Sequence, residues 1–300
     1  MRELGVRAAL AASSLLVMAG AANAADSFVH VGKAGSELAS PFSGWVEGRY
    51  SSVDSVHDNA VAGTTVEGVD AGKWSLRGAA NLRAGSFNIQ VDVDGGTLDN
   101  GPYERTDVAG TVHAYLRPIG GTFAIGAFLR GTQRDFEDIR TDRPGSGEEN
   151  ELLYGGEIAY LAEFATLHLR AGIGTNEYGT DLASLEADRL HVGAGANFYI
   201  GENFRLDLDG TYDRVQHEIL DVDTFTVDAR ANYRFHEKPV SVFAGYRYNT
   251  VELRPRIGGA EEEEQRYGEL YAGAKLHFGT RTLQQEDRSG ALWDTFTALP

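Results

Sequence analysis

The chain contains no cysteine among its 300 residues. Disulfide bonds, thiolate metal sites and thiol catalysis are therefore excluded together. Proline is scarce, with 7 residues beside 37 glycines, and this balance is typical of a chain with many strands and turns. Basic residues are outnumbered as well, at 27 Lys and Arg against 44 Asp and Glu, which gives a formal net charge of −17. That charge repels nucleic acid, so no nucleic-acid partner is expected.

Long hydrophobic runs are also missing. Beyond the N-terminal region no segment approaches the ~20 apolar residues that a membrane-spanning helix requires, which excludes a helical membrane protein. Residues 1–24 carry Arg2 and Arg7, continue into an apolar stretch too short to span a bilayer, and end in Ala-Asn-Ala at positions 22–24. This pattern predicts a secretory signal peptide that is cleaved after residue 24. We therefore expect an exported protein.

Alternation of polar and apolar residues is the dominant pattern that is present. The clearest example is 87–94, where Phe87, Ile89, Val91 and Val93 lie on one face and polar residues lie on the other. Eleven further segments repeat the pattern, at 42–50, 73–82, 107–116, 123–130, 152–162, 166–174, 189–200, 204–212, 225–235, 240–248 and 268–278. The sequence thus predicts twelve strands.

The connections between these strands alternate in length. Tight turns are predicted near 84–85, 118–121, 163–165, 201–203 and 236–239, and long loops at 51–72, 95–106, 131–151, 175–188, 213–224 and 249–267. Short turns at one rim and long loops at the other are typical of a transmembrane β-barrel. We therefore predict an all-β fold, a single antiparallel transmembrane barrel of about twelve strands over residues 42–278. An even strand count places both termini at the short-turn rim, which faces the periplasm in bacterial outer-membrane barrels.

Aromatic residues support the same fold because they gather at the strand ends. On the apolar faces they form two sets, at the short-turn ends (Phe42, Phe87, Phe123, Phe198, Phe204, Phe235 and Phe278) and at the long-loop ends (Tyr50, Trp74, Tyr154, Tyr212 and Tyr248). Amphipathic rings favour the membrane–water boundary, so these sets are interpreted as the two girdles of a membrane barrel.

The chain resembles the outer-membrane β-barrel proteins of the porin-like class, especially alphaproteobacterial members, over residues 42–278. Its last predicted strand, Leu270-Tyr271-Ala272-Gly273-Ala274-Lys275-Leu276-His277-Phe278, resembles the terminal strand that the barrel-assembly machinery reads. In that class an aromatic residue usually ends the chain, whereas residues 279–300 follow Phe278 here. The resemblance implies insertion by the barrel-assembly machinery into the bacterial outer membrane, in contact with its lipid and lipopolysaccharide.

The inward faces of the predicted strands carry both signs of charge. The residues predicted to line the lumen are Arg77, Asp92, Arg170, Arg189, Arg205, Asp228, Arg230, Arg234 and Arg247. One interpretation is a water-filled pore whose charged walls filter solutes. The other is a set of ion pairs that fills a narrow lumen. Twelve strands lie between barrels filled by side chains and barrels with an aqueous channel, so both interpretations stay open.

Other chemistry is sparse in the sequence. Four histidines (His113, His168, His191 and His277) fall on inward faces, but no His pair has close ligand spacing and no Ser/His pair has an identifiable third member. We therefore predict no catalytic, cofactor-binding or metal-binding residues and no enzymatic activity. Acidic residues in the long loops could gather divalent cations beside lipopolysaccharide phosphates, although a solvated acidic surface is the simpler interpretation.

The sequence predicts four parts: a signal peptide at 1–24, a periplasmic lead-in at 25–41, the barrel at 42–278 and a tail at 279–300, which could dangle, fold into the lumen or touch a neighbour. The predicted function is a porin-like channel for passive diffusion of small polar solutes. If the lumen is open, the inward arginines predict weak anion preference at high salt, which shifts toward cations at low salt as the acidic loops regain influence. The alternative is a closed-lumen structural or interaction barrel, and the third hypothesis is a barrel enzyme that acts on lipids. Pairing across tight turns is expected to place Arg77 opposite Asp92 and Asp228 opposite Arg247.

Overall fold

The computed structural model describes residues 40–59, 64–67, 71–99, 103–138, 145–180, 183–256 and 263–293. The predicted signal peptide and nearly all of the predicted lead-in lie outside the described residues. Within them, the structure has no helix that is both long and apolar enough to cross a membrane.

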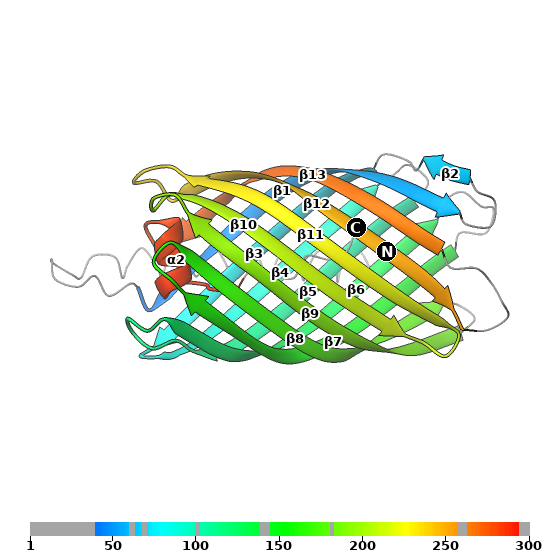
Figure 1. The fold of residues 1–300 in the computed structure, drawn as a ribbon, viewed down its shortest axis with the longest axis horizontal. Helices are drawn as coiled ribbons and strands as arrows, with labels where there is room; N and C mark the ends of the chain where they lie inside the picture. The colour runs from blue at the N-terminus through cyan, green and yellow to red at the C-terminus, as the bar shows by residue number, and fades with distance from the viewer. Residues whose placement is uncertain are drawn as a thin grey trace, which may run out of the picture.

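The described chain forms one closed antiparallel barrel (Figure 1). Its strands are β1 (Phe42–Asn59), β2 (Thr64–Glu67), β3 (Ala71–Ala84), β4 (Phe87–Asp99), β5 (Tyr103–Leu116), β6 (Phe123–Asp138), β7 (Gly145–Leu161), β8 (Ala165–Thr180), β9 (Ala183–Tyr199), β10 (Phe204–Gln216), β11 (Leu220–Arg234), β12 (Val240–Pro255) and β13 (Glu263–Phe278). Each strand pairs with its neighbours in the chain, except that β2 pairs only with the end of β1 and stands outside the ring. Pairing of β13 with β1 closes the ring of twelve, so the predicted fold class is confirmed.

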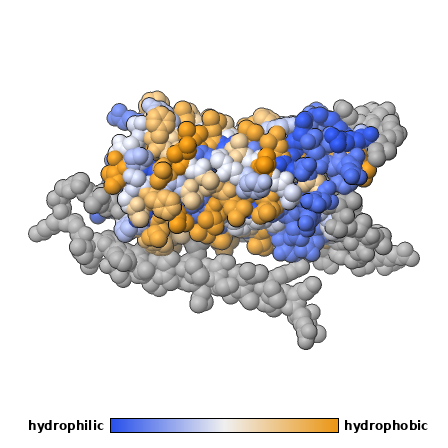
Figure 2. Space-filling view, turned by 90° about the horizontal axis from the view of Figure 1, so that it is seen from below, coloured by the Kyte–Doolittle hydropathy of each residue, from blue (hydrophilic) through white to orange (hydrophobic). Residues whose placement is uncertain are grey.

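The apolar faces of the strands form the outer surface of the barrel. Trp74 and Leu270 are each 65% exposed, and the outward positions of the other strands are similarly apolar. Outward aromatic rings touch across neighbouring strands, with ring centroids 4.8 Å apart for Tyr50 and Trp74. Figure 2 shows one face of the barrel, with apolar residues over much of it and hydrophilic residues gathered at one end. That end is the one to which the long-loop ends of the strands extend.

The predicted long loops are wrong in extent, because the strands continue through most of them. The predicted loop 175–188, for example, lies largely within strands, since β8 extends to Thr180 and β9 begins at Ala183. Above the apolar band both faces of a strand are polar, so alternation disappears from the sequence while backbone pairing goes on. A pattern based on alternation therefore detects only the part of each strand that lies in the apolar band.

The tight turns lie where they were predicted, but one of them sets a different register. The β3–β4 hairpin turns through Gly85, which has a positive φ of 64°, and Ser86, so that Ala84 pairs with Phe87. Arg77 consequently lies opposite Asp94, and the predicted pairing with Asp92 is wrong by two residues. A two-residue turn replaces the four-residue turn that the prediction implied.

The second predicted pair is confirmed. Asp228 lies opposite Arg247 in the β11–β12 ladder, and Arg247 Nη2 is 2.7 Å from the Asp228 carboxylate. A glycine supports this part of the wall, because a Cβ built at Gly245 would lie only 2.4 Å from the Tyr271 hydroxyl. The absence of a side chain at Gly245 thus lets the Tyr271 ring pack flat against the interior wall.

Candidate functional site

All nine residues predicted to line the lumen lie on the inner face of the barrel wall. Seven of them (Arg77, Asp92, Arg170, Arg205, Arg230, Arg234 and Arg247) are between 0% and 8% exposed. The side chains of Arg189 and Asp228 are 9% and 14% exposed. Asp209 is the most accessible of the ion-paired inward acids on this wall, with a side chain 32% exposed. The described interior is therefore polar, narrow and largely closed to solvent.

Glu47 is the centre of one interior cluster. Its carboxylate lies 3.4 Å from Arg77, 3.2 Å from Arg230 and 3.5 Å from Lys275, and it is fully buried. Arg230 makes a second ion pair with Asp207, at 3.2 Å. Both signs of charge are thus satisfied locally, as buried charges require.

Further clusters lie nearer the long-loop end. Glu269 accepts from Arg247 at 3.0 Å and lies 3.3 Å from Arg49. On the other side of the barrel, Arg189 is 2.6 Å from Asp213 and also contacts Glu151. Arginine and carboxylate therefore alternate around the interior.

These ion pairs follow the wall of the barrel. Arg77 and Glu47 lie on adjacent strands, as do Arg247 and Glu269, and Arg230 and Glu47 lie three positions apart in the ring. A pair that bridged the lumen of a twelve-stranded ring would join strands about six positions apart. The pairs named here therefore coat the wall and do not tie opposite walls together.

Contacts that do reach across the barrel pass through residues 280–293, which we call the plug. Helix α2 (Leu283–Ser289) lies inside the ring at the short-turn end (Figure 1). Asp287 accepts from Arg205 of β10 at 2.8 Å and from Asn197 of β9 at 2.7 Å. The carbonyl oxygen of Asp287 accepts from Arg117, directly after β5, at 3.0 Å. Strands β5 and β10 are five positions apart in the ring, so one residue of the plug contacts nearly opposite walls.

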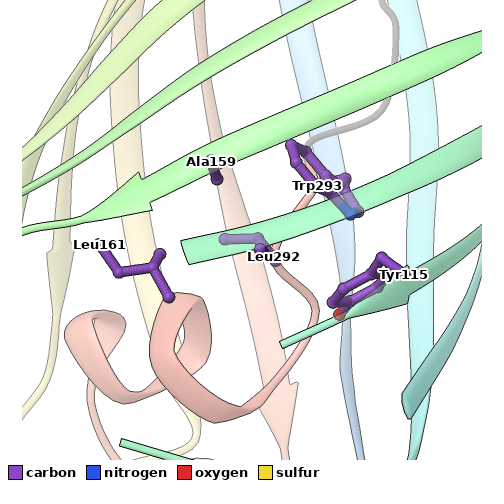
Figure 3. Packing of buried hydrophobic residues seen from close by; sticks show 6 residues of the cluster. Tyr115, Ala159, Leu161, Leu292 and Trp293 are labelled. Carbon is purple, nitrogen blue, oxygen red and sulfur yellow. The ribbon is translucent and has the colours of Figure 1, made fainter. Parts of the chain in front are cut away.

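The end of the plug packs among inward side chains. Trp293 is 2% exposed and belongs to a buried apolar cluster with Leu292, Tyr115, Ala124, Ala159 and Leu161 (Figure 3). Its carbonyl oxygen accepts from Gln90 at 2.6 Å, and its backbone N–H donates to the same side chain at 3.2 Å. Among the three possibilities that the sequence left open for the tail, the structure places its described part in the lumen.

His113 lies beside the indole of Trp293, with ring centroids 6.4 Å apart. Its two ring nitrogens are 3.1 Å from Asp92 and 3.0 Å from Glu157, and all three side chains are buried. Among the described residues, no group of three or more His, Asp or Glu side chains is arranged to hold a metal ion. His113, Asp92 and Glu157 form a buried hydrogen-bonded set beside Trp293.

A Ser–His–Glu arrangement fastens α2 to the wall, and sequence reasoning missed it. Ser241 Oγ of β12 is 2.8 Å from His277 Nε2 of β13, and His277 Nδ1 contacts the Glu286 carboxylate of α2. The order of groups matches a hydrolase triad. However, Ser241 and His277 are only 1% and 2% exposed, so the seated plug excludes a substrate. No sequence signal identified Glu286 as the third member, because nothing in the sequence fixed the position of the tail.

The charge of Glu286 is set by its surroundings. Burial alone would raise the pKa of its carboxyl group, but His277 and the nearby Lys275 and Arg205 lower that pKa to about 2. Glu286 is therefore ionised at neutral pH in spite of its burial. An ionised carboxylate makes a stronger hydrogen bond to the imidazole than a neutral acid would.

No protein-family model matches the chain, and no curated protein sequence does either. Several solved structures are similar in shape. The translocator domain of the autotransporter NalP from Neisseria meningitidis has 11% identity and a TM-score of 0.45, over 91% of this chain and 98% of that one. The toluene transporter TodX of P. putida has 8% identity and a TM-score of 0.42, over 80% and 90%. A loop-deletion mutant of OmpT, an outer membrane protein of Vibrio cholerae, has 9% identity and a TM-score of 0.38, over 81% and 100%.

Proposed function

We propose that the chain is a bacterial outer-membrane β-barrel through which small polar solutes diffuse, and that the conformation described is its closed state. The observation that carries this proposal is that the interior wall and the segment that closes the mouth are separate parts of the chain. The ion pairs coat a polar wall, whereas the short-turn mouth is filled by a separate segment that follows the last strand. A segment of this kind can leave without breaking the strand ladder.

The membrane location is supported by the outer surface. A continuous belt of exposed apolar side chains such as Trp74, Leu169 and Leu270 is unfavourable in water and favourable against acyl chains. Closure of the ring satisfies the backbone polar groups that an open sheet would expose to lipid. We propose lipid and lipopolysaccharide as the surroundings, periplasmic termini, and recognition of β13 by the barrel-assembly machinery during insertion.

A test compares the full mature chain with a variant that ends at Phe278. Both are purified as folded barrels and reconstituted into planar bilayers. The truncated barrel is expected to show stepwise conductance far more often than the full chain, because it lacks the plug. Absence of steps from both proteins would contradict the proposal.

A second candidate, a closed-lumen structural or interaction barrel, is favoured by burial of the interior. Glu47, His113 and Glu269 are all 0% exposed, so the wall side chains themselves leave little free space. This candidate predicts a sealed barrel with or without the plug. The truncation experiment therefore separates the two functions.

A further inference from the structure

We infer that Ser241, His277 and Glu286 form a latch that holds the plug in the barrel mouth, and that opening this latch lets the plug leave. The inference rests on the proposed function, since release of the plug has a role only if solutes pass through the barrel. It concerns how the closed state is maintained, which the fold alone does not explain.

The plug is held from two sides by adjacent acidic residues. Asp287 points to the β9–β10 wall, where Arg205, Asn197 and Tyr199 all donate to its carboxylate. Glu286 points the other way, to His277 on β13. These strands lie three positions apart in the ring. On the β9–β10 side, Leu283 and Gln284 also donate to the carbonyl oxygen of Glu202, so it is loss of the Glu286 contact that frees one side of α2.

The two sides differ in chemistry. The Asp287 side includes a guanidinium, which is permanently charged and strongly bound to carboxylate. The Glu286 side depends on an imidazole, which holds its partner only in the correct tautomer. Release is therefore expected to begin at Glu286.

The ionised carboxylate of Glu286 can only accept a hydrogen bond, so the neutral ring of His277 carries its proton on Nδ1 and donates it to Glu286. Nε2 is then the acceptor for the Ser241 hydroxyl, which supports this tautomer. The cross-strand neighbours of Ser241 are Arg234 and Lys275, whose positive charges disfavour a second proton on the ring. Ser241 is thus a positioning residue that acts on the plug through His277.

The absence of cysteine from the chain makes a direct test possible. Ser289 lies at the end of α2 and is only 9% exposed, so Ser289→Cys gives a single thiol that reacts with a bulky PEG-maleimide only when the plug leaves. In this background, Glu286→Ala removes the latch acceptor. Glu202→Ala removes the same charge at an exposed position of the same rim and keeps the backbone carbonyl to which Leu283 and Gln284 donate, so it serves as the matched control.

We expect Glu286→Ala to accelerate labelling of the full-length barrel in lipid vesicles by about 10- to 100-fold, the factor that corresponds to loss of a hydrogen bond to a charged group. Ser241→Ala should accelerate it by a smaller factor, and Glu202→Ala should leave it unchanged. Labelling of Glu286→Ala at the parent rate would overturn the latch. Covalent capture of Ser241 by a fluorophosphonate in the parent protein would overturn it too, because the serine would then be an accessible nucleophile.

A locked plug separates the latch from the proposed function. A Cβ built at Gly290 lies 3.2 Å from Ser43 Oγ and 2.9 Å from the Glu286 carbonyl oxygen, so Ser43→Cys with Gly290→Cys can join the plug to β1 by a disulfide after a small shift of the backbone at the end of α2. Conductance that rises in Glu286→Ala, falls when this disulfide forms and returns on reduction supports both proposals. Faster labelling of Glu286→Ala without conductance supports the latch and contradicts solute passage.

Discussion

Replacing Glu47 by Gln tests whether the interior ion pairs hold the barrel together. Glu47 is fully buried and faces three cations, Arg77, Arg230 and Lys275, at 3.2 to 3.5 Å. Glutamine keeps the shape of the side chain and removes its charge. The substitution therefore isolates the electrostatic contribution of a single buried carboxylate.

The expected loss follows from what each cation retains. Arg230 keeps its ion pair with Asp207 at 3.2 Å, and Lys275 keeps its position 3.9 Å from the centre of the Trp45 ring. Removing one partner of a buried ion pair costs ~3–5 kcal/mol when the other charge is left uncompensated. Arg77 also lies over the Trp45 ring, 5.7 Å from its centroid. Because all three cations have other contacts, we expect a loss near the lower end, about 3 kcal/mol.

Urea titration of the barrel in phospholipid vesicles, followed by tryptophan fluorescence, measures this loss as a change in the unfolding midpoint. The matched control is Glu104→Gln, the same substitution at an exposed residue of β5, which should leave the free energy of unfolding unchanged. A Glu47→Gln barrel within ~0.5 kcal/mol of the parent would refute the reasoning, since only surface substitutions are normally that mild.

Four further outcomes are expected. The pKa of Glu286 is lowered to about 2 in the docked plug against an ordinary value of 4.5, so its contribution to docking is complete above pH 4.5 and is lost as the pH falls toward 2, which hydrogen exchange of the C-terminal peptide can follow. Trp293→Ala should weaken plug docking by ~3–5 kcal/mol through loss of buried contacts, again seen as faster exchange of that peptide. In an open barrel, wall arginines such as Arg247 keep their carboxylate partners, whereas Arg117 and Arg234 at the mouth lose the oxygens of the plug and become hydrated cations, so reversal potentials should show a weak anion preference that Arg234→Ala reduces. A thiol at Ile219 should be labelled on intact cells and one at Lys238 should not, whereas the opposite result would invert the proposed orientation.

The strands in the apolar band could be predicted because lipid on one face and the lumen on the other each favour a particular residue type. Lipid demands an apolar residue at every second position, as in Phe87, Ile89 and Val91, and the lumen demands polar residues between them. Residues above the band do not face lipid and need not alternate, so the sequence predicted a loop where the ends of β6 and β7 pair. Backbone hydrogen bonds do not depend on side-chain type, so the pairing of these strand ends produces no pattern in the sequence.

For the candidate site, the sequence predicted which residues lie on the inner face of the barrel but not which of them form pairs. Inward charges could be assigned from alternation, but their partners depend on register, and the tight turn at Gly85 moved Arg77 by two residues. The latch could not be predicted, because it joins Ser241 and His277 to α2 and no periodicity in the sequence indicates that α2 lies in the lumen. Contacts between a wall and a separate segment are a property of the tertiary fold.

One feature of the wall nevertheless points to the plug. Around the short-turn mouth, Arg117 and Arg234 donate mainly to acceptors outside the strand ladder, and several of these belong to the tail: the carbonyl oxygens of Asp287 and Gly290 for Arg117, and both oxygens of Thr280 for Arg234. A buried guanidinium without acceptors is strongly unfavourable. The mouth is therefore built to receive a segment rich in carbonyl and carboxylate oxygens, and when the plug leaves, water must enter to take its place. Hydration of these arginines would itself favour an open, polar passage, so we expect departure of the plug to be coupled to opening of the lumen.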